Sequence, residues 1–77
     1  HTLKVYPNPS QGVEVTVEAS SHLSSEVSLF DSKGQLIKNW KDVQASTDLY
    51  LDNLPTGVYL LEYNNAETRQ LRRIVVR

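Results

Sequence analysis

The chain has 77 residues, a net charge of −1 at pH 7, no cysteine and two histidines. Its length fits one small domain, the lack of cysteine excludes a disulfide framework, and two histidines are too few ligands for a His/Cys metal site. A charge this close to zero provides no basic surface for nucleic acid, so we expect no nucleic-acid partner.

The first element is a short predicted strand over residues 3–6, followed by two prolines. Pro7 and Pro9 fix their own φ angles, remove two backbone donors and push the residue before each toward extended geometry. The segment therefore cannot join a central strand, and we interpret it as a strand end that turns into a loop closing at Gly12. A second interpretation stays open, in which the stiff loop presents Asn8 for docking.

Alternating apolar and polar residues predict the next strands. Valines at every second position of residues 13–17 indicate a strand with one face in water. Residues 27–30 and 35–38 flank residues 31–34 (Asp-Ser-Lys-Gly), whose glycine suits the left-handed position of a short loop. These two segments therefore predict a β-hairpin.

The second half of the chain predicts further strands. Leu49 and Leu51 flank an outward-facing Tyr50, and the turn formers of residues 52–57 then end that pattern. Residues 58–63 form the most apolar run, which is typical of a central strand covered on much of both faces.

The predicted last strand, residues 68–76, carries an irregular pattern. Leu71 falls on an odd position and Ile74 and Val76 on even ones, so a regular pleat would aim them at opposite faces. We therefore expect a β-bulge at residues 72–73. With about seven short strands and no helical pattern, the sequence predicts an all-β fold, a small antiparallel immunoglobulin-like β-sandwich.

Few side chains suit catalysis or metal binding. His1 is terminal and His22 lies in a polar stretch, so neither is expected to activate a serine nucleophile. Asp48, Asp52 and Asn53 could offer oxygens to Ca²⁺, but EF-hand spacing is absent and turn chemistry is their expected role. We expect no catalytic residue, no metal and no cofactor, and interpret the chain as not an enzyme.

The aromatic residues allow two interpretations. Trp40, Tyr50, Tyr59 and Tyr63 could form a platform for sugars. Because large rings dominate the cores of small domains, we instead expect Tyr59 in the core and Trp40 half-buried.

The last strand also carries a basic stripe of four arginines: Arg69, Arg72, Arg73 and Arg77. Such charges either protect an edge strand from unwanted pairing or take part in recognition, and the sequence leaves both open. An exposed last strand also predicts a weak homodimer through edge pairing.

Three motifs, taken together and in order, resemble the C-terminal sorting domain of the type IX secretion system of Bacteroidota. The likeness covers essentially all of residues 1–77, which are therefore expected to form one C-terminal sorting domain. Its parts are an opening motif at residues 5–10 with Gly12, a middle motif at residues 27–31 with Gly34, a closing motif at residues 54–61, and a basic-apolar tail at residues 71–77.

The resemblance implies a secretion signal. In this family the outer-membrane translocon recognises the folded domain after transit through the periplasm, and a surface cysteine protease that acts as a sortase then usually cleaves it off. The cargo, N-terminal to the domain, is released or joined to lipopolysaccharide at the outer-membrane surface.

The resemblance also assigns roles to residues. Translocon recognition would fall to the closing motif and the tail: Leu54, Pro55, Gly57, Tyr59, Arg72, Arg73, Ile74, Val75, Val76 and Arg77. The start of the domain would be marked by the opening motif: Tyr6, Pro7, Asn8, Pro9 and Gly12. We expect the translocon to add a strand to the exposed last strand, with the arginines setting the register.

The start of the chain is expected to lie inside a longer protein. It opens on His-Thr without the pattern of a signal peptide, and no apolar run reaches the roughly 18 residues that span a bilayer. We therefore expect a fragment of a longer protein, which the resemblance implies is exported.

Two other functions stay open. A fibronectin-like or immunoglobulin-like module that binds a polysaccharide, or spaces the domains of an extracellular enzyme, would share this fold, and residues 54–59 resemble a tyrosine corner. A small enzyme that depends on His22 is the third interpretation.

Overall fold

The computed structural model describes residues 2–8 and 11–77, which form seven strands and no helix. No helix long and apolar enough to cross a membrane is therefore found in this part of the chain. The strands are β1 (Leu3–Tyr6), β2 (Glu14–Ala19), β3 (Ser25–Phe30), β4 (Leu36–Val43), β5 (Ser46–Tyr50), β6 (Gly57–Asn64) and β7 (Arg69–Val76).

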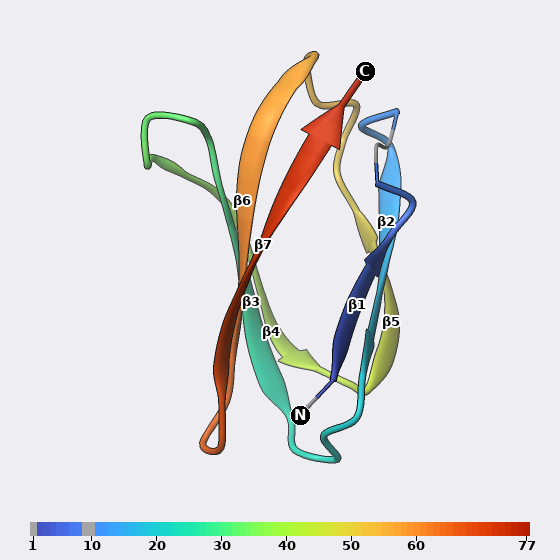
Figure 1. Cartoon of the computed structure of the whole chain (residues 1–77), viewed down its shortest axis with the longest axis vertical. Helices are drawn as coiled ribbons and strands as arrows, with labels where there is room; N and C mark the ends of the chain where they lie inside the picture. The colour runs from blue at the N-terminus through green and yellow to red at the C-terminus, as the bar shows by residue number, and fades with distance from the viewer. Residues whose placement is uncertain (1, 9–10) are drawn as a thin grey trace.

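The strands form two sheets that pack face to face (Figure 1). One sheet has the order β1-β2-β5 and the other β4-β3-β6-β7, and all neighbouring strands are antiparallel. In immunoglobulin-like sandwiches the first, second and fifth strands likewise share one sheet, and the third, sixth and seventh share the other. The predicted all-β sandwich of about seven strands is confirmed.

The core lies between the sheets and follows the two-residue period of the strands. The alternation predicted for β2 is confirmed at Val15 and Val17, whereas Val13 lies just before the strand and is exposed. Tyr59 is buried and Trp40 is half-buried against the core, as predicted. The other buried apolar residues are Leu3, Val27, Leu29, Val43, Leu49, Leu51, Leu61, Tyr63, Ile74 and Val76.

The predicted hairpin joins β3 and β4. Gly34 has a φ of +84°, the left-handed conformation that favours glycine. Oδ1 of Asp31 accepts hydrogen bonds from the backbone amides of Lys33 and Gln35, each at 2.9 Å. The aspartate at the start of the loop therefore fixes the loop through its own side chain.

The predicted bulge in the last strand is wrong. β6 and β7 pair without interruption from Gly57 opposite Val76 to Asn64 opposite Arg69. Leu71 instead faces outward and is 43% exposed. Leu71 needs no bulge because the outer face of this sheet has apolar neighbours for it; the irregular pairing of the sheet lies between β3 and β4.

The corner before β6 is held by a tyrosine. Gly57 begins the strand, and the hydroxyl of Tyr59 donates a hydrogen bond to the carbonyl of Pro55 at 2.7 Å. This is the geometry of a tyrosine corner, as the sequence indicated. Tyr63 lies on the same face of β6, four residues after Tyr59. It is fully buried, and its hydroxyl has no hydrogen-bond partner among the described residues.

The two buried tyrosines of β6 are expected to respond in opposite ways to loss of the hydroxyl. Tyr63→Phe should leave the free energy of unfolding unchanged or raise it by about 1 kcal/mol, because it removes an unsatisfied buried polar group. Tyr59→Phe should lower it by about 1 kcal/mol, because the bond to Pro55 is lost. Urea unfolding of the two variants tests this, and a larger loss in Tyr63→Phe would contradict it.

Candidate functional site

Asn8 of the opening motif is hydrogen-bonded to the backbone of the last strand. Its Oδ1 accepts a hydrogen bond from the amide of Val75 at 3.0 Å, and its Nδ2 donates to the carbonyl of Arg73 at 2.8 Å. β7 is an edge strand, and these two backbone groups face away from β6. The side chain of Asn8 therefore makes the hydrogen bonds that a neighbouring strand would otherwise make with them. We call this pair of hydrogen bonds the Asn8 clip.

Tyr6 of the opening motif lies on the other sheet. Tyr6 is exposed at the end of β1, and its hydroxyl donates a hydrogen bond to Oε2 of Glu18 at 2.9 Å. This bond raises the pKa of Tyr6, because ionisation would set a phenolate against the carboxylate. Pro7 is exposed and follows a cis peptide bond, and Pro9 lies outside the described residues.

Gly12 brings the opening motif against the closing motif and the tail. Its φ is +80°, and a Cβ atom there would lie 2.5 Å from the carbonyl oxygen of Leu54 and 2.9 Å from Cγ1 of Val76. The Gly12 carbonyl accepts a hydrogen bond from the Leu54 amide at 2.8 Å. Glycine fits here because it alone combines the left-handed backbone with so close an approach.

The closing motif alternates between the core and the surface. Leu54 is half-buried against the core, and Pro55 is exposed. Within β6, Tyr59 points inward while Val58 and Leu60 point outward with exposed fractions of 46% and 38%. The motif therefore presents two apolar side chains to solvent.

The arginines of the tail do not share one face, so the expected single basic stripe is wrong. Arg69 and Arg73 lie on the outer face of β7. The guanidinium of Arg72 lies on the other side, where it donates to the carbonyl of Leu3 at 3.3 Å and to Oε1 of Gln70 at 3.0 Å. The alternation of a regular strand separates neighbouring residues in this way.

Burial divides the residues to which translocon recognition was assigned. Tyr59, Ile74 and Val76 are in the core and Leu54 packs against it, so these side chains maintain the fold. The members that are exposed or half-exposed are Pro55, Gly57, Arg72, Arg73, Val75 and Arg77. Their role in recognition stays a prediction.

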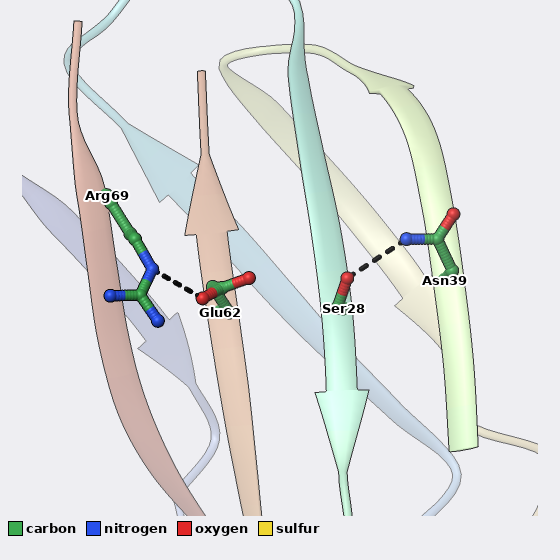
Figure 2. A network of polar contacts seen from close by, with 4 residues as sticks. All are labelled: Ser28, Asn39, Glu62 and Arg69. Carbon is green, nitrogen blue, oxygen red and sulfur yellow. Dashed lines mark hydrogen bonds and ion pairs between the residues drawn. The ribbon is translucent and has the colours of Figure 1, made fainter. Parts of the chain in front are cut away.

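Polar side chains cross the outer face of the four-stranded sheet in one row. Figure 2 shows Nε of Arg69 donating to Oε2 of Glu62 at 2.6 Å, and Nδ2 of Asn39 donating to Oγ of Ser28 at 3.0 Å. The register places Ser28 between Asn39 and Glu62. Within this row the guanidinium of Arg69 pairs with the charge of Glu62.

An apolar groove of about 480 Å³ adjoins this row, and we call it the outer groove. Its lining includes Phe30 from the middle motif, Val58 and Leu60 from the closing motif, Leu71 and Arg73 from the tail, and the ion pair of Glu62 with Arg69. Three segments that are distant in the sequence thus meet on one face. Exposed apolar side chains gathered in this way are typical of an interaction site.

The sequence did not single out the outer groove as a site. Two signals for it were present: residues 58–61 are apolar at every position, and Leu71 is out of phase with Ile74. The first is also typical of a strand covered on both faces, and the second of a bulge. Both reflect outward-facing apolar residues on β6 and β7.

The aromatic residues do not form a common platform. Trp40 pairs with the buried Val27 and faces the core, while Tyr50 lies in the other sheet and is 56% exposed. Tyr59 and Tyr63 are buried. The structure therefore separates the rings that a sugar platform would need side by side.

The residues considered for metal or acid–base chemistry lie in turns or on the surface. Asp52 and Asn53 have positive φ angles of 57° and 56°, which suits a turn, and Asp48 accepts a hydrogen bond from the hydroxyl of Thr16 at 2.7 Å. His22 is exposed. Across residues 2–8 and 11–77, no group of three or more His, Cys, Asp or Glu side chains could hold a metal ion.

A two-sheet antiparallel sandwich with this strand order is immunoglobulin-like, a fold that does not by itself fix a function. Comparison with known families is more specific. The model of the secretion system C-terminal sorting domain matches residues 4–77, so the chain belongs to this family of type IX sorting domains. The resemblance found in the sequence motifs is thereby confirmed.

The chain is also similar to a beta-agarase. It is 25% identical over 65 residues to Beta-agarase A of Zobellia galactanivorans. The aligned segment covers 84% of this chain but only 12% of the agarase. The chain thus spans a small part of the length of the curated relative it matches.

Proposed function

We propose that this chain is the sorting signal of a longer exported protein and that the outer-membrane type IX translocon recognises it in the folded state. The observation that carries the proposal is the family match over residues 4–77, which covers a closed sandwich and not a linear tail. The Asn8 clip and the Gly12 contact support it, because they join the first and last motifs of the family into one structure.

The proposed route has three stages. The cargo, joined before Thr2, crosses the periplasm with the sorting domain, and the translocon carries both to the cell surface. A sortase-like protease then removes the domain, and the cargo is released or attached at the outer-membrane surface. The small share of the agarase that the chain matches supports a label on a larger protein.

Recognition by strand addition to β7 has a structural requirement. The clip occupies the amide of Val75 and the carbonyl of Arg73, and the guanidinium of Arg72 donates to the carbonyl of Leu71 at 2.9 Å. A strand that paired with this edge would have to displace these groups. Recognition through outward-facing side chains has no such requirement.

A reporter fusion tests the proposed function. A fluorescent protein with an N-terminal signal peptide and this chain at its C-terminus would be expressed in Bacteroidota hosts with and without a working type IX system. We expect the reporter outside the cell only in the host with a working type IX system. If the chain is removed, the exported reporter should be about 8.7 kDa lighter than the full fusion. Retention of the folded fusion in the periplasm of both hosts would contradict the proposal.

The structure also changes the obvious truncation experiment. Deleting residues 74–77 removes Ile74 and Val76, which are 0% and 1% exposed, so the truncated chain would lose part of its core. Failure of export would then report unfolding. Substitutions of exposed residues are therefore the informative variants.

A further inference from the structure

We propose that the export machinery docks on the outer groove with a protein segment that inserts apolar side chains between Leu60 and Leu71 and places a carboxylate beside Arg73. This inference rests on the proposed function and names the surface by which the domain is recognised. It locates recognition on the face of the four-stranded sheet and not on its edge.

The exposure of the groove residues is the first argument. Val58, Leu60 and Leu71 are 46%, 38% and 43% exposed, because the alternation of β6 and β7 places these apolar side chains on the outer face of the sheet. Phe30 lies opposite Leu60 in the register and closes the groove on the side of β3. Concave apolar pockets of this kind receive the anchor side chains that dominate the affinity of protein interfaces.

The charges around the groove define the chemistry of the partner. Glu62 is held by Arg69 at 2.6 Å, and the carboxylate of Asp31 is occupied by two amides of its own turn. The guanidinium of Arg73 is exposed beside Leu60 and has no ion-pair partner among residues 2–8 and 11–77. Among the described residues that line the groove, Arg73 is thus the cation without an ion-pair partner, which favours an apolar segment that carries a carboxylate.

The edge of β7 is less suited to docking than the face. The Asn8 clip and Arg72 occupy three of its outward-facing backbone groups. The hydrogen bond from Asn8 goes to the backbone carbonyl of Arg73, and the Arg73 side chain lies on the outer face.

The attachment point of a cargo leaves the groove accessible. Figure 1 shows the beginning of β1 at one end of the sandwich and the β3–β4 turn with the start of β6 at the other. A cargo joined before Thr2 would emerge away from the groove. The same face could therefore be recognised on different cargoes.

Three variants and one matched control test the inference in the reporter fusion. Leu60→Asp, Leu71→Asp and Arg73→Glu are each expected to reduce exported reporter at least tenfold. Tyr50→Asp, at a residue that is 56% exposed on the other sheet, should stay within twofold of the unchanged chain. Thermal unfolding of the purified variants establishes which are folded, and Leu71→Asp on the edge strand provides a second apolar position if Leu60→Asp does not fold.

The outcomes separate this inference from the proposed function. If the unchanged fusion is not exported, the proposed function fails. If it is exported and the folded Leu71→Asp and Arg73→Glu variants are exported equally well, the outer groove is not the docking surface and only the inference is overturned.

Two further measurements with the purified chain exclude other occupants. Binding to vesicles of phosphatidylglycerol and phosphatidylcholine that is lost in Leu71→Asp would assign the face to a membrane. A dimer in sedimentation equilibrium that is lost in the same variant would assign it to a second copy. Either result would overturn the inference, and a monomer that does not bind vesicles supports it.

Discussion

Gly12→Ala is expected to lower the free energy of unfolding by about 3–5 kcal/mol. The new Cβ atom would lie 2.5 Å from the Leu54 carbonyl oxygen and 2.9 Å from Val76 Cγ1, and the backbone would keep a φ of +80°. The Leu54 carbonyl belongs to the backbone and cannot rotate away as a side chain could. The opening motif would therefore have to move away from the closing motif. Domains of this size have total stabilities of roughly 4–12 kcal/mol, so the loss is a large share.

Gly34→Ala is the matched control for this substitution. Gly34 has nearly the same φ, +84°, but a Cβ atom there would meet no atom within 4 Å beyond its two chain neighbours. Gly34→Ala should therefore lower the free energy of unfolding by only about 1–2 kcal/mol, the cost of holding alanine in the left-handed backbone conformation. Urea unfolding of both variants gives the comparison, and equal losses would show that the contact with Leu54 adds nothing.

Ile74→Ala is expected to lower the free energy of unfolding by about 2–5 kcal/mol, and Leu71→Ala by about 0.5 kcal/mol. Ile74 is 0% exposed in the core, whereas Leu71 is 43% exposed on the outer face. Both lie on β7, three positions apart, so the pair measures the register of the last strand. Chemical denaturation of the two variants would give similar losses if a bulge turned both residues inward.

The strands and turns could be predicted because their signals are local. Neighbouring residues alone predict the alternation in β2 and the loop from Asp31 to Gly34, and the structure contains both. Local spacing also indicated the tyrosine corner, since Pro55 and Tyr59 are four residues apart.

The outer groove and the Asn8 clip could not be predicted because they depend on pairings between distant segments. The hydrogen bonds of Asn8 join residues that are 65 and 67 positions apart, and no spacing rule connects them. The proline pair indicated a stiff segment, but not what Asn8 would contact. Leu71 was misinterpreted because an outward apolar residue and a bulge give the same pattern in a single sequence.

The Asn8 clip also couples the two ends of the domain during folding. Asn8 bonds to residues 65 and 67 positions later, on the strand that contributes Ile74 and Val76 to the core. Closing so long a loop is slow relative to local turns, so the opening motif and the last strand meet late in folding. The clip therefore forms only when both segments have reached their native positions, however well the other strands pair.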